Sequence, residues 1–201
     1  MTSLSDEGHL KRLLNDRVEF KLYAAEQHLN RLKEIENAYG DIAKDNARIE
    51  VEMEVDCFLS QLVGTVDSLL FQINDSLDLG IPTDRVDFAN VQSALSAKTK
   101  KIDLLSPLDT ARQQGNWYYM LSEQRNQLVH RTFLKKVISV HDSPTKPRQV
   151  RFLNVQRESE GNPFDHVMDM EIIQYLEKSL QHVRELIFSI RASEPLLQEQ
   201  P

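Results

Sequence analysis

Hydrophobic residues recur at spacings of three and four along most of the chain, a pattern that predicts amphipathic α-helices. The first long helix is expected from about Ser5 to Tyr39 and the second from about Asp41 to Leu79. The apolar positions are Leu10, Leu14, Val18, Leu22, Ala25, Leu29 and Leu32 in the first, and Val51, Val55, Phe58, Leu62, Val66, Leu69 and Ile73 in the second. The second series resembles a coiled-coil seam, which fits either an intramolecular core or a dimer face.

Breaks in the pattern predict two further helices, the second of them interrupted. The segment 80–82, Gly-Ile-Pro, ends the second helix, and Thr83 or Asp84 is expected to cap a third that runs to about Ala97. A serine followed by proline at 106–107 predicts the start of a fourth helix, because proline is favoured at the first helical position. A Gly-Asn pair at 115–116 is expected to interrupt this helix before the stretch 117–135.

The hydrophobic period changes after this stretch. Apolar and β-branched residues at 137–140 and 150–155 flank a segment with two prolines, which predicts a β-hairpin with a loose tip. Asp165 is then expected to cap a last helix that reaches Ile190. The sequence therefore predicts an all-α fold, an antiparallel helical bundle of about five helices, two of them long and N-terminal, with a small β-hairpin inserted before the last helix.

This arrangement fits a single domain over residues 1–201. Its parts are the N-terminal helices in 1–104, the later helices with the hairpin in 105–192, and a flexible tail in 193–201. Hydrophobic residues make up 40% of the chain and charged residues 27%, a balance typical of a folded protein.

Location is indicated by what the sequence lacks. The N-terminus shows no signal peptide, and the most apolar region, Cys57 to Ile73, is interrupted by Gln61, Asp67 and Gln72 and is too polar to span a bilayer. The single Cys57 is expected to be a core residue and has no disulfide partner in the chain. We therefore expect a cytoplasmic protein with no membrane contact.

Charge is distributed unevenly along the chain. The net charge of -7 argues against nucleic-acid binding by the whole surface, and residues 41–87 contain eleven acidic residues. Residues 125–157, by contrast, contain eight lysines and arginines and only one acid, Asp142. This basic segment fits equally well with RNA phosphate binding and with an ordinary solvated hairpin.

The basic segment begins on a predicted helix whose faces separate two candidate residues. Arg125 falls within an apolar arc formed by Trp117, Tyr118, Leu121, Leu128 and Val129, so its guanidinium is expected to be buried, paired or at an interface. Asn126 and His130 share another face, close in angle to Tyr119 and Glu123. Arg125 and His130 differ by about 140° around an ideal helix, so a second helix or a second copy of the chain would help to bring them to one atom.

An imidazole and a guanidinium in one site suit phosphodiester cleavage. Neutral His removes a proton near pH 7, and Arg stabilises the charge that develops on the phosphorane, so no metal is required. The other histidines show no metal-binding spacing, and the chain has no Gly-rich phosphate loop and no nucleophile motif. Kinases, P-loop enzymes and serine hydrolases are therefore excluded, and neither metal nor cofactor is expected.

The segment Arg125-Asn126-Gln127-Leu128-Val129-His130 resembles the active-site motif of the HEPN superfamily. Ribonucleases of this family carry Arg, a polar residue, three further positions and then His on a late helix of an all-helical domain. The resemblance covers residues 105–190, whereas the first hundred residues match only as two long helices. It implies a homodimer with both motifs facing across the interface. It also implies a metal-independent endoribonuclease that uses 2′-hydroxyl attack and acts as a toxin or antiphage-defence effector.

The resemblance assigns roles to individual residues. It implies that Arg125 and His130 are catalytic and that Asn126 orients them or contacts the RNA substrate. Residues expected to bind substrate at the rim are Arg131, Tyr119, Glu123 and Lys135. Thr132 occupies the position of a tyrosine found in HEPN toxins that a nucleotidyltransferase antitoxin silences, which makes that pairing less expected, although an inhibitory antitoxin or partner protein remains a candidate.

Two other interpretations fit the same residues. One is a catalytically inactive HEPN-like helical module that binds a partner protein or a nucleotide. The other is an unrelated structural protein in which Arg125 pairs with an acid of the second long helix. The aromatic residues at 117–119 could stack bases, although aromatic side chains at helical spacing more often fill a core.

Overall fold

The computed structural model describes residues 4–39, 45–98, 102–113, 116–130, 134, 136–139, 149–153 and 168–197. Most of these residues are helical, which confirms the predicted helical bundle. In the described part of the chain, no helix is long and apolar enough to cross a membrane.

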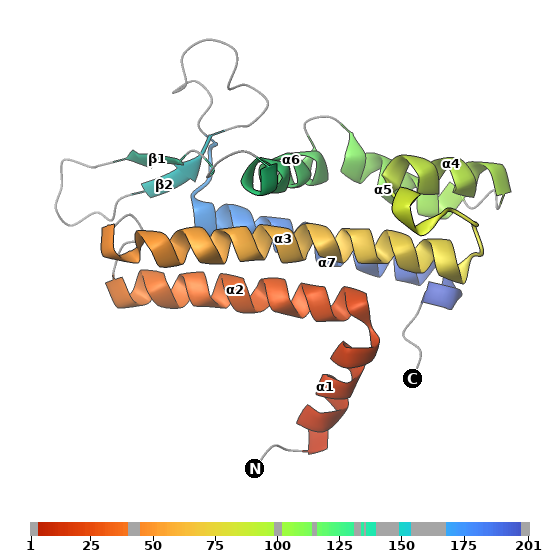
Figure 1. Ribbon diagram of the computed structural model, residues 1–201, viewed down its shortest axis with the longest axis horizontal. Coiled ribbons are helices and arrows are strands. Elements are labelled where there is room, and N and C mark those ends of the chain that lie inside the picture. Colours follow the sequence, from red (N-terminus) through yellow and green to blue (C-terminus); the bar gives the residue numbers. More distant parts are fainter. Residues whose placement is uncertain are drawn as a thin grey trace, which may run out of the picture.

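The bundle is built around α3 (Asp45–Ser76). It lies side by side with α2 (Arg17–Tyr39), and α7 (Ile172–Ser193) packs against both (Figure 1). Every position of the predicted seam in α3 is buried, and Leu59, Val63 and Leu70 are buried as well. The seam is therefore intramolecular core, and it is wider than a coiled-coil stripe because helices pack on several sides of α3. Cys57, expected in this core, is exposed instead.

The first predicted helix is divided in two. Residues Leu4–Asn15 form α1, which turns away from the bundle (Figure 1), and α2 begins after Asp16. Asp16 caps α2, since its Oδ1 accepts the backbone N–H of Val18 at 2.9 Å and of Glu19 at 3.2 Å. As a result Leu10 and Leu14, expected in the core, are 49% and 80% exposed.

α3 ends near the predicted break, but the next α-helix is capped by a different residue from the one expected. Gly80 has a φ of 71°, a conformation that glycine adopts without strain. Thr83–Arg85 form a 3-10 turn, η1, and the helix α4 spans Phe88–Lys98. Asp87 caps α4 in place of Thr83 or Asp84, because its Oδ1 accepts the N–H of Asn90 at 2.8 Å.

The next helix, α5, spans Ile102–Arg112, so Pro107 lies inside it instead of at its first position. Asn116 directly precedes α6 (Trp117–His130), and its Oδ1 accepts the N–H of Trp117 at 2.8 Å. This confirms the predicted interruption before residue 117. The described part of α6 reaches His130, and Leu134 is not helical, so the helix does not continue to residue 135 as expected.

Two antiparallel strands, β1 (Lys136–Ser139) and β2 (Gln149–Phe152), pair where the hairpin was predicted. In their register Ile138 lies opposite Val150. Buried Phe152 packs edge-on against Tyr175 of α7, with ring centroids 5.8 Å apart, and so joins the strands to the bundle. The predicted tip lies outside the described residues.

The end of the chain differs from the prediction. Asp165, the expected cap of the last helix, lies outside the described residues, and the N-cap position of α7 is Glu171. After α7, Pro195–Leu197 form a 3-10 turn, η3, in which Leu197 is buried against α3 and α7. The tail predicted to be flexible from residue 193 is therefore anchored at Leu197, since an apolar side chain there completes the core.

Arg191 of α7 forms ion pairs with two acids at the α1–α2 junction. Its Nη2 lies 2.6 Å from Asp16 Oδ2, and its Nη1 pairs with Glu19. All three side chains are largely buried, so removing the guanidinium would leave two carboxylates without their cation.

We predict that Arg191→Met lowers the free energy of unfolding by about 2 kcal/mol, measured by urea denaturation. The matched control is Arg184→Met, because Arg184 pairs with Glu26 at 2.9 Å but both side chains are well exposed. Arg184→Met should lower the free energy of unfolding by less than about 1 kcal/mol. Equal losses in the two variants would contradict a structural role for the Arg191 cluster.

Candidate functional site

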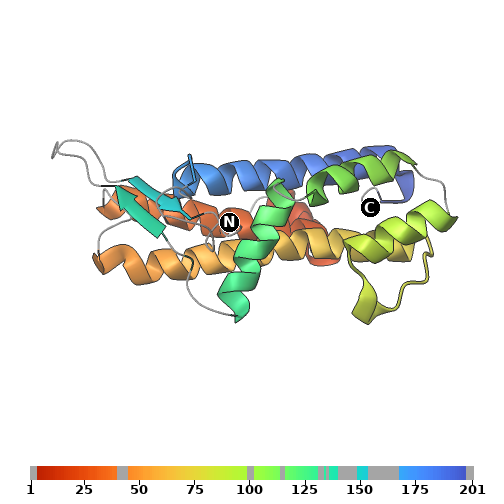
Figure 2. The ribbon, with the colours of Figure 1, turned by 90° about the horizontal axis from the view of Figure 1, so that it is seen from above.

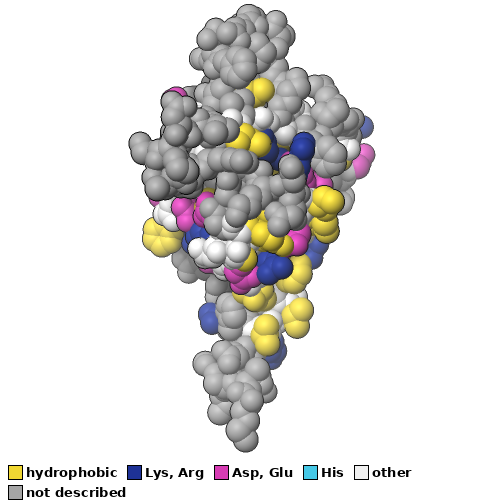
Figure 3. Space-filling view, turned by 90° about the vertical axis from the view of Figure 1, so that its left-hand side faces the viewer, with side chains coloured by type: hydrophobic (Ala, Val, Ile, Leu, Met, Phe, Trp, Pro, Cys, Tyr) yellow, Lys and Arg dark blue, Asp and Glu magenta, His cyan; other side chains and the backbone are white. Residues whose placement is uncertain are grey.

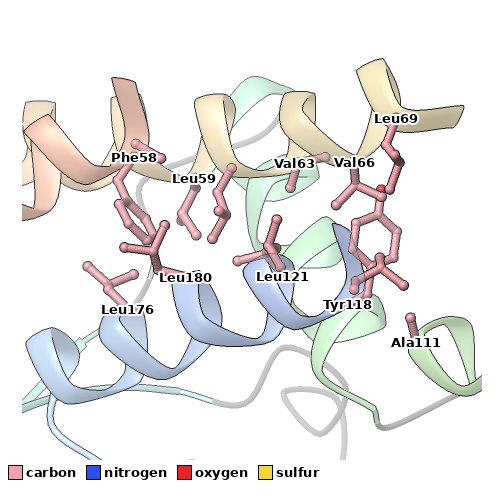
Figure 4. Packing of buried hydrophobic residues seen from close by; sticks show 14 of the residues in the cluster. Phe58, Leu59, Val63, Val66, Leu69, Ala111, Tyr118, Leu121, Leu176 and Leu180 are labelled. Carbon is pink, nitrogen blue, oxygen red and sulfur yellow. The ribbon is translucent and has the colours of Figure 1, made fainter. Parts of the chain in front are cut away.

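The helix α6, which carries the motif, crosses over α3 and also contacts α7 (Figure 2). Its inward face differs from the predicted arc, because Gln124 is fully buried whereas Val129 is 54% exposed. The amide of Gln124 is satisfied there, since its Oε1 accepts the Tyr175 hydroxyl at 2.8 Å. The close-up in Figure 4 shows Tyr118 and Leu121 of α6 beside the core residues of α3. This packing leaves the side of α6 that carries the motif partly open.

Arg125 reaches from α6 to α3, where its Nη2 lies 3.5 Å from Oδ2 of Asp67. The side chain of Arg125 is 28% exposed and that of Asp67 is 46% exposed. The expectation that Arg125 is paired is therefore confirmed, and the partner is an acid of the second long helix, as the structural interpretation required. The pair is solvent-accessible and long, however, unlike a buried core ion pair.

Asp67 is the centre of a polar cluster that joins three helices. Burial raises the pKa of its carboxyl, and the nearby charges of Arg125 and Lys21 together with a hydrogen bond from Tyr118 offset part of that rise. Burial beside the same carboxylate raises the pKa of the Tyr118 hydroxyl strongly, so Tyr118 is a neutral hydrogen-bond donor. Lys21 comes from α2, Asp67 from α3, and Tyr118 and Arg125 from α6.

Lys21 reaches this cluster by crossing α3 at Gly64. A Cβ atom at Gly64 would lie 2.6 Å from Lys21 Nζ and 3.2 Å from its Cε, so the absence of a side chain leaves room for the lysine. Burial and the nearby charge of Arg17 lower the pKa of the Lys21 ammonium, and Asp67 partly offsets this. The glycine therefore determines how closely Lys21 approaches α3.

The other predicted site residues of α6 lie beside the cluster. Tyr119, Glu123 and Asn126 are each partly exposed, and within the described part of the chain no hydrogen bond or ion pair engages their side chains. His130 is the last residue of α6, and its side chain lies outside what the structure describes. Arg131 and Lys135 also lie outside the described residues. The position of the imidazole relative to Arg125 thus stays a prediction.

The basic segment that begins at Arg125 is not uniformly available to a ligand. Lys136 forms a largely buried ion pair with Glu52 of α3, and its Nζ lies 5.9 Å from the centre of the Phe152 ring. Arg151 donates to the side chain of Gln149 at 2.8 Å. Figure 3, which views the left-hand side of Figure 1, shows acidic and basic side chains interspersed among the described residues. At least one member of the basic segment is therefore structural.

Comparisons of the chain with protein-family models, curated proteins and solved structures gave no match. The resemblance to HEPN ribonucleases therefore depends on the motif and its helix. Among the residues that the structure describes, no group of three or more His, Cys, Asp or Glu side chains could hold a metal ion.

Sequence reasoning did not find Lys21, Gly64 or Asp67. A glycine within an otherwise apolar helical run was the available signal, because glycine disfavours a helix and suggests close packing there. Which cation occupies that space depends on how α2 is placed against α3, and no pattern along the chain encodes that placement.

The effect of filling the space above Gly64 on the stability of the protein can be measured directly. We predict that Gly64→Ala raises the free energy of unfolding by about 0.5 to 1 kcal/mol, because alanine favours the helix and the clash involves only the flexible end of Lys21. Urea denaturation would measure this change. If Gly64→Ala instead lowers the free energy of unfolding, the prediction is wrong, and the Lys21 side chain cannot move away from the added methyl group.

The raised pKa of Asp67 makes a pH-dependent prediction. Because the folded state holds the proton more tightly than the unfolded chain, ionised Asp67 reduces stability at neutral pH, and this cost disappears as pH falls through the raised pKa toward 3.8. Asp67→Asn should therefore be more stable than the wild type at pH 7, by less than about 1 kcal/mol at this half-exposed position. The difference should shrink near pH 4. Urea denaturation at both pH values checks it, and a variant less stable at pH 7 would contradict it.

Proposed function

We propose that this protein is a HEPN-like, metal-independent endoribonuclease that acts in the cytoplasm as a toxin or antiphage-defence effector. The observation that carries the proposal is the state of Arg125. Its guanidinium is partly exposed on a helix with the Arg-Asn-x-x-x-His motif and is engaged by an accessible carboxylate 3.5 Å away.

This ion pair is compatible with substrate binding. A half-exposed pair at this distance contributes little to stability, so an RNA phosphate can replace Asp67 as the partner of Arg125. A phosphate is also the better ligand, because guanidinium binds its oxygens through two parallel hydrogen bonds. Asp67 and Tyr118 would hold Arg125 in place before the substrate arrives.

The proposed site requires two copies of α6. Arg125 faces α3, and His130 lies about 140° further around an ideal helix. In a homodimer with two α6 helices facing each other, the histidine of one protomer can complete the site of its partner.

The chemistry follows from these groups. Neutral His130 would accept the proton of the 2′-hydroxyl while the 2′-oxygen bonds to phosphorus and the bond to the 5′-oxygen breaks. Arg125 would stabilise the negative charge of the phosphorane. The leaving 5′-oxygen takes a proton from the imidazolium, and the products are a 2′,3′-cyclic phosphate and a 5′-hydroxyl. Asn126, one turn before His130, would orient the imidazole or the substrate.

We predict that Arg125→Ala and His130→Ala each reduce RNA cleavage by roughly 100-fold or more, because each removes a group that acts in the transition state. The matched controls are Arg184→Ala and His182→Ala on α7, which lie outside the motif and should retain activity. Cleavage of labelled RNA in the presence of EDTA, with detection of the cyclic phosphate, measures the effect. If the purified wild type cleaves RNA no faster than His130→Ala, the enzyme proposal fails.

A second candidate function is a catalytically inactive helical module that binds a partner protein or a nucleotide. It is favoured by the fact that Arg125 already has a partner within the chain, which accounts for the position of the arginine without any chemistry. This candidate predicts normal growth on overexpression. The ribonuclease predicts growth arrest that His130→Ala relieves and that an inhibitory antitoxin or other partner protein would prevent.

A further inference from the structure

A cation outside the motif lies beside the proposed site. The side chain of Lys21, from α2, extends across α3 over Gly64 and approaches the carboxylate that holds Arg125. Within the described part of the chain, no ion pair closer than 4 Å engages its ammonium. Lys21 therefore brings a positive charge to the cluster that no described acid engages at close range.

The charges of this cluster do not balance. Lys21 and Arg125 are its cations, and Asp67 is the acid that interacts with both. Arg17 lies close enough to Lys21 to disfavour its charged form, and its guanidinium carbon is 5.2 Å from the centre of the Phe20 ring. The excess of positive charge favours an anion, in contrast to the net charge of -7 of the whole chain.

We propose that Lys21 is a further substrate-binding residue, which together with Arg125 holds a phosphodiester of single-stranded RNA over Gly64. The inference rests on the proposed ribonuclease function and extends its site from α6 to α2. Arginine supplies a planar fork for two phosphate oxygens, and lysine supplies a compact charge that can reach a third oxygen or the adjacent phosphate. Gly64 matters because a side chain there would occupy the position of the ammonium.

The test measures RNA binding separately from cleavage. His130→Ala protein, which is not expected to cleave, is titrated into a fluorescein-labelled single-stranded RNA of mixed sequence, and anisotropy gives Kd at several salt concentrations. Lys21→Met, which retains the aliphatic stem, should raise Kd about fivefold and make the slope of log K against log salt shallower by about 0.7. Gly64→Ala, which keeps every charge but displaces the ammonium, should also raise Kd. Lys178→Met, at an exposed site on α7, is the matched control and should leave Kd unchanged.

The outcomes separate the inference from the function on which it rests. If Lys21→Met binds RNA like the Lys178→Met control, or if the His130→Ala protein binds no RNA, the proposed role of Lys21 is overturned. If RNA binding depends on Lys21 but the wild type does not cleave, the role of Lys21 stands as RNA binding and the ribonuclease proposal fails. If the wild type cleaves and Lys21→Met leaves KM unchanged, only the role of Lys21 fails.

Discussion

The burial of α3 is the constraint on which the rest of the structure depends. This helix packs against α2, α6 and α7, so its apolar surface is wider than that of a helix in a simple pair. Burying this surface provides most of the driving force for folding. Several other elements, including the short turn η3 that buries Leu197, take their positions by packing against α3.

Polar interactions set the boundaries of this core. Asp16, between α1 and α2, caps the start of α2 and pairs with Arg191. At this residue the chain changes direction, so α1 points away from the bundle. Inside the bundle, Gln124 and Tyr175 satisfy each other between α6 and α7. Such groups stabilise one arrangement over others because a shift in helix position would leave them buried without hydrogen bonds.

The candidate site lies where the neighbouring helices leave part of α3 exposed. Asp67 lies on α3 between α2 and α6, so a cation from each helix approaches the same carboxylate. Because the site remains partly exposed, these charges can exchange partners with an incoming anion, which a fully buried network could not do. The same partial exposure accounts for the small stability effect expected of Asp67→Asn.

The amino-acid sequence by itself determined the helical class, the seam of α3, the place of the strand pair and the motif from Arg125 to His130, because these depend on periodicity and local spacing. It did not determine that α1 leaves the bundle, because Leu10 and Leu14 have the same spacing as core residues and only tertiary packing decides what covers them. Nor could it show that Asp67 pairs with Arg125 or that Lys21 lies over Gly64. These contacts join residues far apart in the chain, and the crossing of α6 over α3 and the packing of α2 beside it decide them.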